Sequence, residues 1–344
     1  MKKLLNTLYV MSENGYLGLD GETIVIYDGE KEVGKVPLHN LEGIVSFGYR
    51  GTSPALMGAC ADREYFSLLF NTTGEIFSTS NWKNMWKCIL RDRSNIQVVK
   101  MKKRSLEISK NCISGKVYNA RWVLERAIRD HAMQIDKERV KVASLQLKTF
   151  LQYIQNAESK EQLRGYEGEA ASIYFSVFDE LILQQKKDFS FRGRSKRPPM
   201  DNVNAMLSFV YTLLTNQITS ALEVVGLDPC VGYLHTERPG RASLALDLIE
   251  EFRAVYADRF VLSLINKKIV NKKNFTKKEN GAVLMDDDSK KKLLMEWQNK
   301  KKEVITHPFL KEKVEWGMVP YVQAMLLARY LRGDLDGYPA FLWK

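Results

Sequence analysis

Between residues 232 and 253 the chain combines potential metal ligands with cations that suit phosphate. These side chains are His235, Arg238, Arg241, Asp247 and Glu250. Imidazole and carboxylate groups bind divalent metal ions in proteins, and arginine binds phosphate through two parallel hydrogen bonds. The stretch therefore predicts a metal site that faces an anionic polymer.

The acids of this stretch are expected on a helix over residues 243–255. Ser243 follows a Pro-Gly pair, and we expect it to be the N-cap residue. Apolar residues then recur at helical spacing, at Leu244, Leu248, Ile249 and Phe252. Asp247 and Glu250 would lie roughly 60° apart and could serve one site together. The alternative is an ordinary amphipathic helix whose early acids suit the helix dipole, and for an acid pair alone this is the commoner case.

The charge of the chain is unevenly distributed. The 344 residues are 45% hydrophobic and 27% charged, which is typical of a soluble globular protein with room for two domains. Residues 1–85 hold 7 Lys and Arg against 10 Asp and Glu, whereas the rest holds 45 against 31, so the net charge of +11 divides into −3 and +14. We expect only the second part to bind a polyanion.

The composition also bears on location. No apolar run approaches the ~20 residues of a membrane span, and the first residues lack the apolar core of a signal peptide. The four cysteines are far apart in the sequence, at Cys60, Cys88, Cys112 and Cys230. A disulfide framework or structural zinc site is not expected, and the cytoplasm is the predicted location.

Residues 1–83 are predicted to form a small β-rich domain that mediates dimerisation. The expected strands are Leu4–Val10, Tyr16–Leu19, Thr23–Tyr27, Gly43–Phe47 and Tyr65–Phe70. Asp20-Gly21 and Asp28-Gly29 are hairpin-turn signals, and a helix is expected over Pro54–Asp62. A module with spare strand edges is a plausible dimer interface.

Residues 84–344 are predicted to form a larger all-α domain, so the predicted fold class is α+β. Apolar periodicity near 3.6 supports eight helices: Asn95–Asn111, Lys116–Asp136, Glu138–Ala157, Gly168–Leu183, Asp201–Leu222, Ser243–Val255, Ser289–Lys302 and Val319–Leu331. This domain would hold the predicted metal site and bind the polyanion.

The second part contains three basic clusters. The first, residues 186–199, mixes cations with Phe and Gly and includes Arg192, Arg194, Lys196 and Arg197. Because it is Arg-rich and resembles a loop, we expect phosphate contacts there. The other two, Lys267–Lys278 and Lys290–Lys302, are more simply explained as solvated lysine-rich faces.

Four motifs occur in a fixed order in the second part. They are Glu167-Gly-Glu-Ala-Ala, Arg197-Pro-Pro-Met-Asp-Asn-Val-Asn-Ala, Gly232-Tyr-Leu-His and Leu246-Asp-Leu-Ile-Glu-Glu-Phe-Arg. In this order they resemble the Cas-one family, the CRISPR-associated integrase-nucleases of spacer acquisition. The resemblance covers essentially the whole chain and is strongest to the subtype I-C branch. We place Glu167 at the start of a helix, where neighbouring small residues would let another backbone approach.

The resemblance implies a metal site made by Glu167, His235 and Glu250, which would hold Mg²⁺ or Mn²⁺. Many family members have Asp where this chain has Glu250, so this ligand has a longer reach. Asp247 would then be an auxiliary acid, although it could share the metal with Glu250. Arg238 and Arg241 would bind neighbouring phosphates.

The resemblance also implies a reaction and partners. A 3′-hydroxyl of new spacer DNA would attack a phosphodiester at a CRISPR repeat, and the same site could act as an endonuclease. The expected partners are double-stranded DNA (spacer precursor and repeat), a second copy of the chain and a dimer of the Cas-two protein, with no membrane. The alternatives are a non-enzymatic nucleic-acid-binding scaffold and a stand-alone nuclease for branched repair intermediates.

Overall fold

The computed structural model describes residues 7–10, 12, 14–41, 43–46, 50–62, 66–70, 76–79, 101–236 and 238–344. Contacts within the chain define two compact units. Unit 1 comprises Met1–Leu90, Leu294–Val304 and Glu315–Met318, and unit 2 comprises Arg91–Leu293, Ile305–Val314 and Val319–Lys344. The predicted domain boundary after residue 83 lies outside the described residues and stays a prediction.

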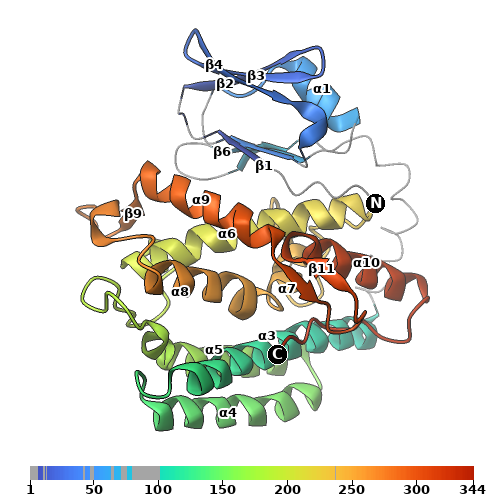
Figure 1. Ribbon diagram of the computed structural model, residues 1–344. Coiled ribbons are helices and arrows are strands. Elements are labelled where there is room, and N and C mark those ends of the chain that lie inside the picture. Colours follow the sequence, from blue (N-terminus) through green and yellow to red (C-terminus); the bar gives the residue numbers. More distant parts are fainter. Residues whose placement is uncertain are drawn as a thin grey trace. The chain divides into compact units, whose positions relative to one another are not determined.

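One sheet of unit 1 is an antiparallel meander (Figure 1). It contains β2 (Gly15–Asp20), β3 (Thr23–Asp28) and β4 (Lys31–Pro37). Gly21 and Gly29 have φ angles of +56° and +66° at the two connections, where glycine adopts the left-handed region without strain. Both predicted hairpins are confirmed. The sequence prediction missed β4, whose charged residues and Gly34 weaken the strand signal.

The other sheet of unit 1 has the strand order β1-β5-β6-β7. Its strands are β1 (Thr7–Val10), β5 (Gly43–Ser46), β6 (Phe66–Phe70) and β7 (Ile76–Thr79). The β1–β5 and β5–β6 pairs are parallel and β6–β7 is antiparallel. Helix α1 (Pro54–Asp62) has the predicted bounds, and its Leu56 and Cys60 belong to a core that includes Leu17, Ile24 and Leu38.

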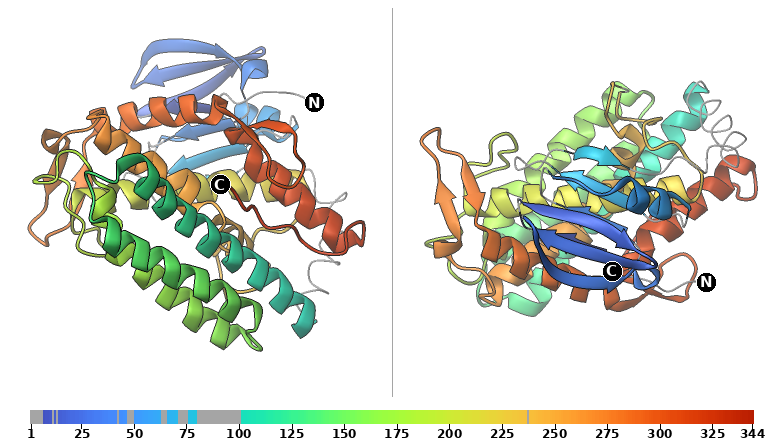
Figure 2. Two further views of the ribbon diagram at one scale, coloured as in Figure 1. Left: turned by 60° about the horizontal axis from the view of Figure 1, so that its bottom comes forward. Right: turned by 90° about the horizontal axis from the view of Figure 1, so that it is seen from above.

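Unit 2 is mostly helical, which confirms the predicted α+β class (Figure 2). Its long helices are α3 (Lys102–His131), α4 (Lys137–Gln155), α5 (Lys160–Ser176), α6 (Asn202–Val224) and α10 (Val319–Arg332). Helix α9 (Asp287–Lys302) contributes to both units. The later half of the chain also has four short strands that the sequence did not predict: β8 (Phe275–Lys277), β9 (Val283–Met285), β10 (Val304–Thr306) and β11 (Lys313–Glu315).

Helices α3 and α5 are among those whose bounds differ from the prediction. Helix α3 continues through residues 112–115, where a break was expected. A Cβ at Gly115 would lie 3.0 Å from the Glu251 side chain, so glycine allows α3 to pack closely against Glu251 there. Helix α5 begins at Lys160 because the Ser159 hydroxyl accepts from the Gln162 backbone N–H. Glu167 therefore lies mid-helix, and its predicted place at a helix start is wrong.

The predicted helix over residues 243–255 is interrupted. Helix α7 (Ser243–Ile249) is followed by turn residues 250–252, a π-helical segment η3 (Arg253–Asp258) and α8 (Arg259–Asn266). The backbone N–H groups of Glu251 and Phe252 bond three residues back, which tightens the chain after α7. Ser243 is not the N-cap residue. Ala242 takes that position, and the Ser243 hydroxyl donates to the Thr236 carbonyl instead.

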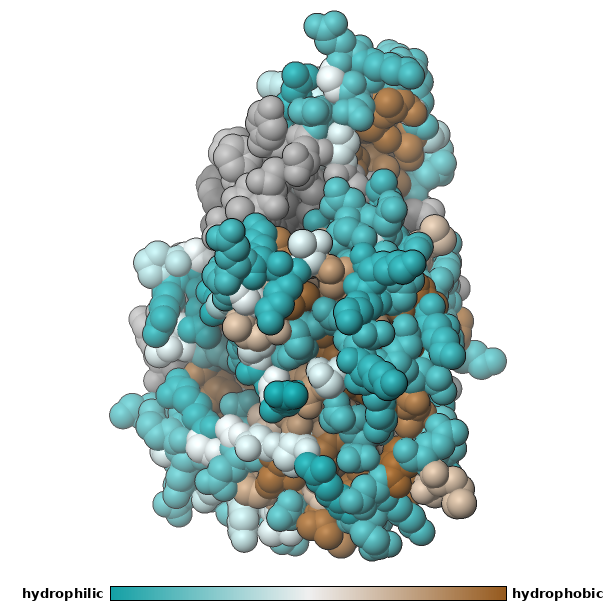
Figure 3. Space-filling view, turned by 90° about the vertical axis from the view of Figure 1, so that its left-hand side faces the viewer, coloured by the Kyte–Doolittle hydropathy of each residue, from teal (hydrophilic) through white to brown (hydrophobic). Residues whose placement is uncertain are grey.

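No helix in the described part of the chain is long and apolar enough to cross a membrane. Hydrophilic residues cover most of the face shown in Figure 3, and hydrophobic residues appear there only in small patches between them.

Candidate active site

The loop of residues 232–242, called the His235 loop, is built around the carboxylate of Asp247. This carboxylate accepts hydrogen bonds from the backbone N–H groups of Tyr233 (2.5 Å), Leu234 (3.0 Å) and His235 (3.0 Å). Its Oδ1 also lies 2.6 Å from His235 Nδ1. Asp247 is fully buried, and both of its carboxylate oxygens are hydrogen-bonded to this loop. The arrangement supports an auxiliary role for Asp247, one that orients the imidazole.

The loop can form because glycine allows it to approach α7 closely. A Cβ at Gly232 would lie 2.7 Å from the Ser243 Cβ and 2.9 Å from the Ser243 carbonyl carbon. Further along the loop, Gly240 has a φ of +71°, and the Arg241 N–H donates to the Arg238 carbonyl at 3.0 Å. The predicted Pro-Gly turn therefore places the two arginines at its ends.

Glu250 follows the last residue of α7 and is 3% exposed. Arg253 lies 3.0 Å from its Oε1, and the Lys116 ammonium lies 2.7 Å from its Oε2. Burial acts to raise the pKa of Glu250, but the charges of Arg253 and Lys116 outweigh it and lower the pKa to about 2. Glu250 is therefore a buried carboxylate that stays ionised.

Glu167 faces the same ammonium from α5. Its Oε1 forms an ion pair with Lys116 Nζ, and its side chain is 28% exposed. Lys116 thus joins a carboxylate of α5 to one at the end of α7. Gly168, next to Glu167, does not serve the predicted backbone approach, because a Cβ there would meet nothing within 4 Å.

Lys116 was not predicted from the sequence, although its position on an apolar helix face is a signal. On α3 it occupies the stripe of Ile113, Val117 and Ala120, all of which are buried. A lysine at an apolar position of a helix requires a partner for its charge, because burial of an unpaired ammonium is costly.

Glu167, His235 and Glu250 are the side chains that could bind a divalent metal ion here. Among the described residues, no group of three or more His, Cys, Asp and Glu side chains is arranged to hold a metal ion as the structure stands. The chemistry of the residues nevertheless fits. Glu167 and Glu250 face one common cation, Lys116, and His235 lies close enough to Glu250 to influence the pKa of that carboxyl. Because Nδ1 of His235 is bonded to Asp247, Nε2 is the ring nitrogen that remains to bind a metal ion. This is the usual arrangement of a metal-binding histidine.

The cationic residues predicted to bind DNA differ in their surroundings. Arg194 forms hydrogen bonds within the protein, because its guanidinium donates to the Ser195 carbonyl, Asn204 and Ser208. Partial burial is the main cause that lowers the pKa of Lys196, and the charge of Arg253 lowers it further. Lys196 therefore lies near the site. Four further cations are at least partly exposed at the surface of unit 2: Arg192, Arg197, Arg238 and Arg241.

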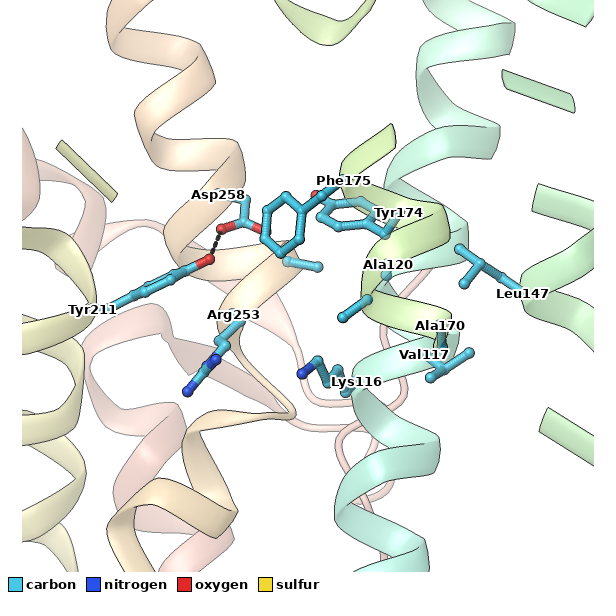
Figure 4. Close-up of a pocket in the computed structure, with 12 residues that line it drawn as sticks. Lys116, Val117, Ala120, Leu147, Ala170, Tyr174, Phe175, Tyr211, Arg253 and Asp258 are labelled. Atoms are coloured by element: carbon cyan, nitrogen blue, oxygen red, sulfur yellow. Dashed lines mark hydrogen bonds between the residues drawn. The ribbon is translucent and has the colours of Figure 1, made fainter. Parts of the chain in front are cut away.

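Tyr211 and Asp258, for which the sequence suggested no role, lie close to Arg253. The Tyr211 ring has the guanidinium groups of Arg194 and Arg253 each 5.2 Å from its centroid. Its hydroxyl donates to buried Asp258 at 2.6 Å. Tyr211, Arg253, Asp258 and Lys116 are among the residues that line a cavity of ≈ 30 Å³, into which Lys116 extends from α3 (Figure 4). Burial raises the pKa of Asp258 to about 6.

Comparison with known proteins identifies the family of this chain. The family described as CRISPR associated protein Cas1 matches residues 8–299. The chain belongs to the Cas1 family. CRISPR-associated endonuclease Cas1 1 of Chlorobaculum tepidum is 45% identical over 100% of both chains, and endonuclease Cas1 2 of Rhodospirillum rubrum is 47% identical over 100% of both chains. The likeness to the subtype I-C branch stays a prediction.

Solved structures share the fold. A Cas1 protein from Thermotoga maritima superposes with a TM-score of 0.82 at 21% identity, over 97% of this chain and 99% of the other. A casposase bound to its integration product gives a TM-score of 0.80 at 22% identity, over 98% and 94%. At these identities the likeness supports the Cas1 fold alone.

Proposed function

We propose that this Cas1-family chain is a metal-dependent DNA endonuclease and integrase that inserts spacer DNA into a CRISPR array. Glu167, His235 and Glu250 would hold one Mg²⁺ or Mn²⁺. When bound, this ion would polarise the scissile phosphate and stabilise charge on the attacking or leaving 3′-oxygen. The observation that carries the proposal is the hydrogen bond between buried Asp247 and partly exposed His235, near a buried Glu250 that is ion-paired with Arg253 and Lys116.

The protein's own residues would position the reactants. Asp247 holds His235 Nδ1, so the imidazole keeps one orientation and one tautomer. Arg253 holds Glu250 Oε1, which keeps the carboxylate in place. Arg238, Arg241 and the exposed cations Arg192, Lys196 and Arg197 would bind DNA phosphates on both sides of the site.

The proposed partners follow from the same family. One relative in structure is a chain of a Cas6-RT-Cas1–Cas2 complex, matched over 36% of its length (TM-score 0.81), and another is a TtCas1–DNA complex (TM-score 0.57). We propose that this chain likewise acts on double-stranded spacer and repeat DNA with a Cas2 dimer. It would form a homodimer through residues 1–83 and work in the cytoplasm.

A strand-transfer assay tests the proposal. Wild type and the Glu167→Ala and His235→Ala variants would be mixed with Cas2, spacer DNA and a repeat-containing plasmid, with Mn²⁺ or with EDTA. We expect integration only by wild type with metal, while all three proteins still bind DNA. Glu169→Ala, an exposed acid on the same helix, is the matched control and should integrate like wild type.

The results separate the alternative functions. Normal integration by Glu167→Ala or His235→Ala would show that the proposed ligands are wrong. Salt-sensitive DNA binding without any metal-dependent chemistry would instead support a non-enzymatic scaffold. Metal-dependent cleavage of branched DNA without integration would support a stand-alone repair nuclease.

A further inference from the structure

Lys116 has a position that the Cas1 assignment does not explain. Its ammonium is paired with Glu167 Oε1 on one side and lies 2.7 Å from Glu250 Oε2 on the other. The Lys116 side chain is only 12% exposed. A buried ammonium is costly unless it is paired, and here two carboxylates from different elements pair with it.

The four ion-paired groups around this ammonium balance in charge. Lys116 and Arg253 contribute two positive charges, and Glu167 and Glu250 contribute two negative charges. Both oxygens of Glu250 already face a cation, Oε1 to Arg253 and Oε2 to Lys116. A divalent ion added to this set would create an uncompensated double positive charge and would need carboxylate oxygens that Lys116 occupies.

We propose that Lys116 is a resident counter-ion that takes the place of the metal between Glu167 and Glu250, and that a divalent ion must displace it. The proposal rests on the proposed function, because it assumes these carboxylates to be metal ligands. Lys116 is a positioning residue: it holds the two carboxylates together before metal arrives and weakens the affinity for metal by competition.

Removal of the positive charge should therefore have opposite effects without and with metal. Without metal, two close carboxylates lose their shared cation and repel each other, so the protein should melt at a lower temperature. With metal, no ammonium has to be displaced, so the divalent ion should bind more tightly. A lysine with a purely structural role would lower stability in both conditions and would not increase the affinity for metal.

The test measures Mn²⁺ binding by the full chain with calorimetry, together with the melting temperature in EDTA and in Mn²⁺. For Lys116→Met we expect the Kd for Mn²⁺ to fall about tenfold or more, since one unit charge at ion-pair distance is removed. The melting temperature should be lower than wild type in EDTA and should rise more than that of wild type on addition of Mn²⁺. Lys116→Gln, which retains a hydrogen-bond donor, should show the same direction if the Met variant folds poorly.

Two further variants serve as controls. Lys116→Arg keeps a positive charge and should keep a Kd near that of wild type. Lys110→Met removes a lysine from the same helix whose ammonium bonds the Gln155 carbonyl instead, and it should not change the Kd. An unchanged or higher Kd in both Lys116→Met and Lys116→Gln would overturn the proposal.

Glu167→Gln separates this proposal from the proposed function. If Glu167→Gln abolishes Mn²⁺ binding while the Lys116 variants bind like wild type, only the counter-ion role is wrong. If Glu167→Gln binds Mn²⁺ like wild type, the ligand assignment is wrong, and the counter-ion proposal is overturned with it.

Discussion

The carboxylate of Asp247 holds both the backbone and the imidazole of His235. One oxygen, Oδ1, lies 3.0 Å from the His235 backbone nitrogen and 2.6 Å from its Nδ1. The other oxygen accepts from two preceding backbone N–H groups. A single buried side chain therefore fixes the loop and aims the imidazole.

Substitution of Asp247 should separate these two effects. Asp247→Ala leaves three backbone N–H groups without their acceptor, so we expect a loss of about 3 kcal/mol or more in the free energy of unfolding. His235→Ala keeps those backbone bonds and should cost much less. Denaturant unfolding of both variants measures the difference, and equal losses would contradict a role of Asp247 in building the loop.

Asp247→Asn tests the orientation of His235. The amide retains an acceptor oxygen for the loop but no longer provides a carboxylate for Nδ1. We expect a folded protein whose strand transfer is about 10- to 100-fold slower, which is the usual cost of a lost orienting partner. Initial rates with Mn²⁺ measure the effect, and a wild-type rate would show that His235 needs no carboxylate.

Gly232 should tolerate no side chain. Because its Cβ would overlap Ser243, Gly232→Ala should lower the free energy of unfolding by about 1–3 kcal/mol and slow strand transfer. The matched control is Gly165→Ala on α5, where a Cβ meets nothing within 4 Å. This change should raise stability by up to about 1 kcal/mol, since alanine favours the helix. Thermal melts of both variants check the opposite signs.

Asp258 should make stability fall as the pH rises. Burial raises its pKa from 3.8 to about 6 in the folded protein, although Tyr211, Tyr174, Arg253 and Arg194 oppose this. The folded state therefore binds the proton more tightly than the unfolded state, and the stability that this gives is lost between about pH 4 and pH 6.

Asp258→Asn isolates this effect because its amide can still accept from the Tyr211 hydroxyl but cannot ionise. We expect its advantage over wild type to grow from pH 4 to pH 6 and to reach up to about 3 kcal/mol, the equivalent of about two pKa units. Urea unfolding at several pH values provides the measurement. A constant difference between the two proteins would contradict the raised pKa.

Glu251 should stabilise the packing of residues 338–343. Its buried carboxylate accepts from the Tyr338 hydroxyl (2.7 Å), the Phe341 N–H (2.7 Å) and the Gln323 amide (3.0 Å). Glu251→Ala leaves the buried Tyr338 hydroxyl and Phe341 N–H without this acceptor and should cost about 3 kcal/mol in the free energy of unfolding. Asp336→Ala, at an exposed site nearby in the sequence, is the control and should change stability by less than about 0.5 kcal/mol.

Local sequence signals were sufficient for part of this structure. The Asp-Gly turns, helix α1 and the change from strands to helices were predictable because glycine conformation and apolar periodicity depend on neighbouring residues. Residue types drew attention to His235, Asp247 and Glu250, and the resemblance to the Cas1 family added Glu167.

The roles within the site could not be read from spacing. A regular helix would have placed Asp247 and Glu250 beside each other, but α7 ends at Ile249, and the two carboxylates have separate partners. Asp247 binds the His235 loop, and Glu250 meets Lys116 from a helix more than a hundred residues earlier. The sequence by itself determined the class of fold and the residue types of the site. Only the tertiary structure decided which acid orients the histidine and which cation stands between the carboxylates, because buried charges are fixed by partners that are distant in the chain.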